Sequence, residues 1–379
     1  MAGIYVHVPF CKKRCIYCDF YTQTELTYKK QYIDALCKEA VLRKDYIKGE
    51  TIDTIYFGGG TPSLFNKSDF EFIFDTLASY FDISAEPEIT IEANPDDLNE
   101  DYIKDLSALP LNRISIGIQS FNDNDLEFLN RRHSAIQAIE AVRECQKAGF
   151  ENISIDMMYG LPGQTTDMWI DNVYQAVRLG IQHISAYHLI YEENTRLFSL
   201  WERREVAPVD DNLSVDMFSA MISMLSEAGY IHYEISNFAK EGYFSKHNSS
   251  YWLGNKYLGL GAAAHSYDRE SRTWNISSIK EYIKGIDAGA PAEEIEFLDN
   301  HIRYNEFIMT GLRTMWGVDL HKLNDMFGED MLTYCLKNVK KYIEGGLASI
   351  DNDILKLTKK GVFLSDGIMS DLMYVEDHI

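Results

Sequence analysis

GIYVHVPFCKKRCIYCDF, residues 3–20, places three of the chain's six cysteines directly after a short apolar run. Cys11, Cys15 and Cys18 have the spacing CxxxCxxC, which lets three thiolates converge on one small object but hinders disulfides among them. A structural zinc site normally has four protein ligands, and no fourth Cys or His follows at a suitable spacing. A four-iron cluster on three thiolates keeps one iron open. The spacing therefore favours an iron–sulfur site over zinc and over three ordinary reduced thiols.

An aromatic residue, Tyr17, stands directly before the last of these cysteines. CxxxCxxC with an aromatic at that place resembles the signature of the radical S-adenosylmethionine (SAM) superfamily. The resemblance implies a [4Fe-4S] cluster on Cys11, Cys15 and Cys18. In that superfamily the open iron chelates the amine and carboxylate of SAM, and an electron from the cluster splits SAM to a 5′-deoxyadenosyl radical.

The composition predicts a folded, soluble protein of the cytoplasm. The chain has 379 residues, of which 46% are hydrophobic, so it can bury a large core. No apolar run approaches the roughly 18 residues of a membrane span, and the N-terminus lacks a basic segment followed by an apolar one. A formal charge of −22 disfavours nucleic acid and anionic lipid as partners. The remaining cysteines, Cys37, Cys145 and Cys335, lie in helical apolar patterns and are predicted to be buried thiols.

Short β-rich runs alternate with helical stretches over the first half of the chain. The predicted strands are Ile4–Val8, Ile52–Phe57, Glu88–Glu92, Arg113–Gly117, Ile153–Met157 and His183–Tyr187. The predicted helices are Tyr28–Arg43, Ser68–Ser79, Glu100–Ala108, Asp123–Asn130, Ala135–Ala148 and Asp167–Leu179. This alternation indicates βαβ units and a parallel sheet. Six units are too few for a closed eight-stranded barrel.

Several predicted strands end in residues that carry chemistry, as barrel strands do at a site. Gly58–Gly60 follow the second strand, Glu92 closes the third, Gln119 follows the fourth and Asp156 lies late in the fifth. The triple glycine is either a bare turn or backbone that a ligand approaches closely. Glu92 and Asp156 are either buried, satisfied carboxylates or ligand-facing ones, and their places at strand ends favour the second interpretation.

This arrangement resembles the partial (βα)6 TIM-like barrel of radical SAM enzymes. YFGGGTP, IEANP, IGIQSFND, NRRH and IDMMYGLPGQT occur here in the order found in the oxygen-independent coproporphyrinogen dehydrogenase (HemN) family and its HemW relatives. The resemblance covers nearly the whole chain. It implies SAM-binding roles for Tyr5, Tyr17, Gly59, Glu92 and the backbone near His265. Further positions match those that hold a second SAM in the dehydrogenase: Gly60, Thr61, Gln119, Arg131, Asp156 and Ile190. Arg131 taken alone would be predicted to be a surface residue.

The rest of the chain is predicted to form a C-terminal α+β region, giving an α/β protein with three parts. These are the barrel with its cluster loop (1–205), an α/β extension (206–295) and a winged-helix-like domain (296–379). In the extension, Met217, Met221 and Met224 lie on one helix and are predicted to be core. Residues 300–379 carry nine Lys and Arg against twelve Asp and Glu, so the last domain is predicted to pack against protein rather than DNA.

The extension contains HNSSYW, residues 247–252. On chemistry alone His247 is either an exposed or capping histidine or an axial ligand of haem iron, with Tyr251 and Trp252 covering the macrocycle. The string resembles the HNxxYW motif of the HemW branch of haem chaperones. The resemblance implies a haem site on His247, Tyr251 and Trp252.

Two departures separate the chain from the dehydrogenase pattern CxxxCxxCxC. Phe20 replaces the fourth cysteine, and only ten residues precede Cys11. We therefore expect a haem chaperone that holds a cluster, SAM and haem, delivers haem to respiratory haem proteins, and lacks coproporphyrinogen dehydrogenase activity. An electron donor for the cluster is an expected partner, and a homodimer is conceivable. The alternatives are the dehydrogenase itself, which decarboxylates two propionates in porphyrin biosynthesis, and a radical SAM enzyme acting on another tetrapyrrole.

Overall fold

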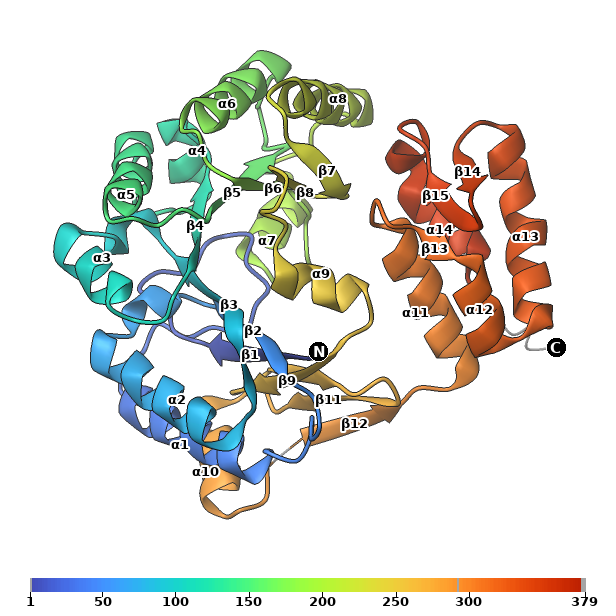
Figure 1. Ribbon diagram of the computed structural model, residues 1–379. Coiled ribbons are helices and arrows are strands. Elements are labelled where there is room, and N and C mark those ends of the chain that lie inside the picture. The colour runs from blue at the N-terminus through green and yellow to red at the C-terminus, as the bar shows by residue number, and fades with distance from the viewer. Residues whose placement is uncertain (1, 292, 376–379) are drawn as a thin grey trace.

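The computed structural model describes residues 2–291 and 293–375, so Met1, Ala292 and residues 376–379 of the predicted last domain lie outside the described part. One large sheet organises the molecule, with the strand order β12-β11-β10-β9-β1-β2-β3-β4-β5-β6-β8-β7. Its centre is parallel from β9 to β6. The sheet curves without closing, and its helices line the outside (Figure 1).

Six βα units build the barrel, as the alternation of strand and helix patterns predicts. The strands are β1 (Ala2–Val8), β2 (Ile52–Gly59), β3 (Ile83–Ala93), β4 (Arg113–Gln119), β5 (Ile153–Tyr159) and β6 (His183–His188). The helices are α1 (Lys29–Leu42), α2 (Lys67–Tyr80), α3 (Glu100–Ser107), α4 (Asp123–Phe128), α5 (Ala135–Lys147) and α6 (Thr166–Arg178). The partial barrel is confirmed.

Local sequence sets where these elements begin and end. Asn66 and Ser134 start α2 and α5 with capping boxes, in which each cap and the third helical residue exchange hydrogen bonds. Alternate positions of the strands carry buried β-branched residues on one face of the sheet; in β4 these are Ile114, Ile116 and Ile118, all fully buried. Because parallel strands all point the same way, their carboxyl ends meet at one edge of the barrel.

Residues after β6 extend this sheet at both edges instead of forming a separate layer. The strands β9 (Lys256–Leu260), β10 (His265–Tyr267), β11 (Ser271–Asn275) and β12 (Glu293–Phe297) continue it beyond β1. Beyond β6 come β8 (Asn237–Ala239) and β7 (Ile231–Glu234). The helices of this part are α7 (Arg196–Glu202), α8 (Asp211–Glu227), α9 (Lys246–Trp252) and α10 (Ile279–Asp287). Met217 and Met221 of α8 are buried in the core, as predicted.

The C-terminal domain has its own hydrophobic core and stands beside α9 and β7 (Figure 1). It comprises α11 (Asn300–Leu312), β13 (Val318–Asp319), α12 (Leu320–Phe327), α13 (Glu329–Glu344), β14 (Ala348–Asp351), β15 (Ile354–Leu357) and α14 (Ser365–Leu372). Asn352 and Asp353 form the hairpin turn between β14 and β15, and both adopt positive φ, at 50° and 59°. In the part of the chain that is described, no helix is both long and apolar enough to cross a bilayer.

Candidate functional site

The cysteine loop connects β1 to α1 at the carboxyl edge of the barrel. Its two ends are tied together, because the Cys11 N–H donates to the Gln23 carbonyl at 2.9 Å and the Gln23 N–H donates to the Pro9 carbonyl at 2.7 Å. Cys11 is buried, whereas Cys15 and Cys18 are half-buried, and none of the three forms a disulfide. Cys37, Cys145 and Cys335 are buried free thiols in the helices, as predicted.

A cavity of about 510 Å³ lies over this edge, and we call it the cysteine cavity. All three loop cysteines line it. So do nine of the eleven predicted SAM residues: Tyr17, Gly59, Gly60, Thr61, Glu92, Gln119, Arg131, Asp156 and Ile190. The other two, Tyr5 and His265, line an adjoining space of about 860 Å³, the α9 cavity, which shares Gly59 and Glu92 with the first. Residues far apart in sequence are thus brought to one place.

The donors around the cysteines suit bound thiolates. The Thr61 hydroxyl donates to Cys11 Sγ at 3.4 Å, and Arg131 Nη1 donates to Cys15 Sγ at 3.3 Å. Burial raises the pKa of the Cys11 thiol and raises that of Cys18 to about 11. Within the described residues, no three His, Cys, Asp or Glu side chains gather closely enough for a single metal ion. A cluster distributes three thiolates over three irons, so these cysteines could hold a cluster.

Arg131 lies inside the cysteine cavity, not on the surface. Its Nη2 donates to Asn94 Oδ1 at 2.6 Å and also to the Gly117 carbonyl. A Cβ at Gly117 would lie 3.2 Å from Arg131 Nη2 and 3.1 Å from Gln119 Nε2, so the glycine gives both side chains room. Gln119 itself has a positive φ of 69°, a strained conformation for a residue with a side chain. The end of β4 is therefore built to hold these two groups at the cavity.

Two half-buried carboxyls, Glu92 and Asp156, face the cysteine cavity. Glu92 accepts the Tyr56 hydroxyl at 2.7 Å and the Gly59 N–H at 3.1 Å. Burial raises the pKa of Glu92 to about 7, and Asp156 contributes to the rise. Burial likewise raises the pKa of Asp156 to about 6. A cationic ligand group would favour the ionised carboxylates, so this wall is suited to an ammonium or sulfonium.

Steric crowding explains why glycine stands at two positions of the triple glycine, Gly59 and Gly60. Gly59 has φ +101°, and a Cβ there would lie 2.3 Å from the His7 ring. A Cβ on Gly60 would lie 2.6 Å from the Val8 carbonyl oxygen. Both glycines also line the cysteine cavity, so the turn and the open backbone predicted as alternatives occur together.

HNSSYW forms α9, and its histidine is anchored in the barrel. His247 is 1% exposed. Its Nδ1 lies 2.8 Å from the Thr54 hydroxyl of β2 and its Nε2 lies 2.7 Å from the Tyr251 hydroxyl. Burial lowers the His247 pKa to about 3, so the ring is neutral and serves both bonds. Tyr251 lines the α9 cavity together with His247, whereas Trp252 lines a different space beside the C-terminal domain.

Sequence reasoning missed several residues that build the site. Tyr56 binds Glu92 and stacks on His247 with ring centres 4.9 Å apart, and Asn94 holds Arg131. Glu88 accepts the first two N–H groups of α9, from Lys246 at 3.0 Å and His247 at 2.9 Å. Tyr56 and Asn94 stand inside the strings YFGGGTP and IEANP, which was the available signal. Glu88 gave no such signal in the sequence, because its partner Lys246 is 158 residues away.

Comparisons with known proteins agree with this geometry. Residues 5–174 match the radical SAM superfamily and residues 298–364 match the HemN C-terminal domain. The chain is 33% identical to heme chaperone HemW of Lactococcus lactis, over 97% of this chain and 96% of that protein. It is 32% identical to heme chaperone HemW of Bacillus subtilis, over 97% and 98% of the two chains. The mitochondrial radical S-adenosyl methionine domain-containing protein 1 of Bos taurus is 32% identical, over 98% and 87%.

The fold also has a counterpart among solved structures. Coproporphyrinogen III oxidase (HemN) from Escherichia coli, described as a radical SAM enzyme, superposes with a TM-score of 0.84 at 24% identity. The match covers 98% of this chain and 90% of that one. At this identity the likeness shows the shared fold of the barrel and C-terminal domain.

Proposed function

Because this chain belongs to the heme chaperone HemW family of radical SAM proteins, we propose that it binds a [4Fe-4S] cluster, SAM and haem and passes haem to respiratory haem proteins. The observation that carries the proposal is the shared wall of two cavities. Gly59 and Glu92 face both the three cysteines and the space under α9, the helix formed by HNSSYW. A cluster site and the chaperone motif are therefore neighbours.

In this proposal Cys11, Cys15 and Cys18 hold the cluster, and the other residues of the cysteine cavity hold SAM. When bound, the cluster supplies an iron without a thiolate, to which the amine and carboxylate of SAM can coordinate. Glu92 and Asp156 favour the cationic end of the ligand. Arg131 stays beside Cys15 and balances the charge of the thiolate, while Gly60 and Thr61 give the ligand access to backbone.

Helix α9 is the proposed haem-binding element, through its predicted residues His247, Tyr251 and Trp252. His247 does not fit an axial ligand in the described arrangement, because Thr54 and Tyr251 occupy both ring nitrogens. An iron would first have to displace the Tyr251 hydroxyl. The ligand role of His247 stays a prediction.

The proposal also names the protein's partners and the compartment in which it acts. The protein acts in the cytoplasm, takes an electron from a reduced protein donor, and gives haem to a haem-accepting respiratory protein. A homodimer is proposed only as a state to test by light scattering with and without haem.

One assay separates this function from the dehydrogenase. The full chain, with its cluster reconstituted anaerobically and SAM present, is titrated with haemin and then incubated with coproporphyrinogen III and a reductant. We expect saturable haem binding and no loss of coproporphyrinogen. Stoichiometric formation of protoporphyrinogen would contradict the chaperone function and favour the dehydrogenase.

A further inference from the structure

Contacts that do not involve the thiols hold the cysteine loop against the barrel. Asn130, in the loop after α4, donates its Nδ2 to the Arg14 carbonyl at 2.7 Å. The Ile16 N–H donates to the Leu129 carbonyl at 3.4 Å, and the Ile16 carbonyl accepts the Leu197 N–H at 2.8 Å. The path of the loop is therefore set partly by neighbouring segments of the protein.

One carboxylate, Asp97, connects the cysteine loop to several of these segments. It ends the short helix η2 (Pro95–Asp97) after β3, and its side chain is 3% exposed. Its Oδ1 accepts Lys12 Nζ of the cysteine loop at 2.6 Å. Its Oδ2 accepts Ser63 Oγ at 3.0 Å and Arg132 Nη2 at 3.1 Å. Asp97 thus joins the loops after β2, β3 and α4 to the cysteine loop.

The charges around Asp97 are balanced, so the anchor is stable where it is buried. Asp96 Oδ2 pairs with Arg132 Nη1 at 2.9 Å, which leaves two carboxylates facing two cations. A buried carboxylate is costly unless it accepts hydrogen bonds, and bonds from cations are the strong ones. If the side chain of Lys12 is removed, Asp97 keeps its other two donors. Loss of the lysine should therefore release the cysteine loop and leave the rest of the network in place.

The loops that Asp97 ties together also supply the donors to the thiols. Thr61, which donates to Cys11 Sγ, is in the loop after β2. Arg131, which donates to Cys15 Sγ, is in the loop after α4. Asp97 touches neither sulfur, so it can act on the thiols only by fixing the loops that carry them and their donors.

We propose that Asp97 is a positioning residue for the cluster: through Lys12 it holds the cysteine loop in shape before the cluster arrives. The inference rests on the cluster binding proposed above and adds how the chain keeps three thiols ready for it. Ordering a loose loop during assembly would subtract its conformational entropy from the binding free energy. A loop that the protein has already ordered avoids that cost.

The test compares Lys12→Met and Asp97→Asn with the wild type, using the cluster-free full chain under reducing, anaerobic conditions. Hydrogen exchange is followed by mass spectrometry in peptides that cover residues 11–18. We expect these amides to exchange roughly fivefold faster in both variants, a factor that allows for the partial exposure of the lysine. Exchange in β5 and α13 should not change. Iron uptake during reconstitution should slow by about the same factor, because fewer chains hold the loop ready.

Two further variants separate the ion pair from its net charge. Lys13→Met is the matched control, because it removes the same charge from the next residue of the loop. Lys13 is exposed and forms no ion pair with a residue in the described ranges 2–291 and 293–375. This control should exchange and take up iron as the wild type does. Lys12→Arg keeps a cation opposite Asp97 and should restore most of the protection that Lys12→Met loses.

The other outcomes are distinct. Loop exchange in Lys12→Met that equals that of the wild type overturns the anchor. Faster exchange throughout the chain, including β5 and α13, gives Asp97 a general structural role and overturns positioning as well. An equal effect of Lys13→Met assigns the change to net charge and does the same. In these three cases cluster binding by the wild type stands. A wild type that takes up no iron overturns the proposed function, and this inference with it.

Discussion

Glu92 is the residue whose protonation most directly links the stability of the barrel to its ligand. Its pKa is about 7 in the folded protein because of burial, against an ordinary value of 4.5. A carboxyl with a raised pKa stabilises the fold fully below pH 4.5 and loses that contribution as the pH rises to about 7. The difference corresponds to about 3 kcal/mol.

We therefore predict that Glu92→Gln makes the free energy of unfolding of the cluster-free protein less dependent on pH. Between pH 4.5 and 7 the wild type should lose about 3 kcal/mol more free energy of unfolding than the variant does. Urea unfolding followed by tryptophan fluorescence at a series of pH values measures this. The exposed, matched change Glu202→Gln should leave the wild-type slope unaltered. Parallel pH profiles for Glu92→Gln and the wild type would show that Glu92 is ionised throughout.

Cys15 offers a second test at the residue scale. Only three cysteines line the cysteine cavity, so Cys15→Ser leaves two thiolates for a cluster that requires three of them. We expect the reconstituted variant to lose most of its iron and acid-labile sulfide, whereas Cys335→Ser, in the distant C-terminal core, should retain them. Full iron content in Cys15→Ser would reveal a ligand outside the loop.

At the scale of elements, α9 shows how a short helix can be fixed by distant residues. Seven residues are too few to form a stable helix alone. Glu88 accepts its first N–H groups, and Thr54 binds His247 one turn before Tyr251. The orientation of the motif thus depends on strands β2 and β3.

If His247 positions α9 and does not ligate iron, His247→Ala should weaken haemin and protoporphyrin IX binding by the same factor, roughly tenfold. Calorimetric titration of both ligands gives the two ratios, and cluster absorbance should be unchanged. His321→Ala, at an exposed histidine of α12, serves as the control. A loss confined to haemin, with a shifted Soret band, would instead establish His247 as the axial ligand.

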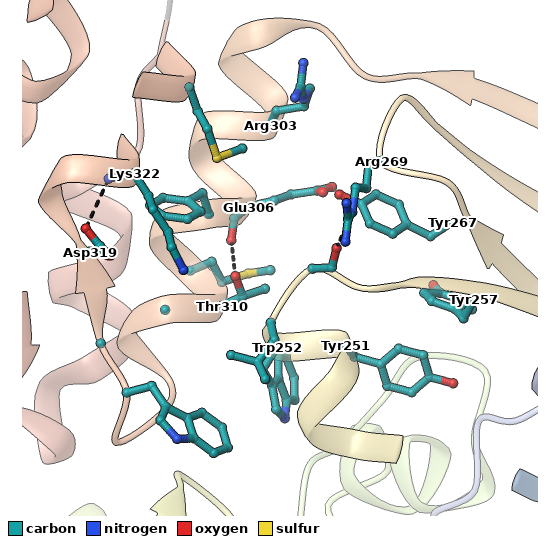
Figure 2. A pocket seen from close by; sticks show the side chains of 18 of the residues that line it. Tyr251, Trp252, Tyr257, Tyr267, Arg269, Arg303, Glu306, Thr310, Asp319 and Lys322 are labelled. Atoms are coloured by element: carbon teal, nitrogen blue, oxygen red, sulfur yellow. Dashed lines mark hydrogen bonds between the residues drawn. The ribbon is translucent and has the colours of Figure 1, made fainter. Parts of the chain in front are cut away.

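The elements themselves were largely predictable, whereas their junctions were not. Strand β2 and helix α2 follow from apolar periodicity and the Asn66 cap, which are local properties. Helix α7 and strand β13 were missed because they are seven and two residues long. Most residues named for the SAM site line one cavity, and they could be collected from the sequence because its motifs are contiguous strings. The interdomain cleft, a cavity of about 610 Å³ between α9 and the C-terminal domain, was not predicted (Figure 2), since Trp252 and Lys322 are 70 positions apart and only tertiary packing places both on its wall.

For the molecule as a whole, the contact between barrel and C-terminal domain decides whether the interdomain cleft exists. Arg313 is central to this contact. Its Nη2 donates to Glu234 Oε1 at 2.8 Å, its carbonyl accepts the Ile235 N–H at 3.1 Å, and its guanidinium lies 4.9 Å from the centre of the Trp252 ring. Glu234 is 2% exposed, and Arg313 is its ion-pair partner.

We predict that Arg313→Met destabilises the cluster-free protein by about 2 kcal/mol. Breaking a fully buried pair typically costs about 3–5 kcal/mol, and the smaller value follows because the Arg313 side chain is 26% exposed. Urea unfolding measures the change. As a control, Arg203→Met removes an exposed pair with Glu205 and should cost less than about 1 kcal/mol.

The double variant Arg313→Met/Glu234→Gln identifies the cause of this loss. If the loss comes from a buried carboxylate without a partner, removing the charge of Glu234 in the Arg313→Met background should restore roughly half of it, because a neutral amide costs less to bury. Asn237 donates to Glu234 Oε2 at 2.5 Å and can donate equally to an amide oxygen, so the loop after β7 should keep its shape. A double variant as unstable as Arg313→Met alone would show that the interface depends on the packing of the arginine and not on its charge.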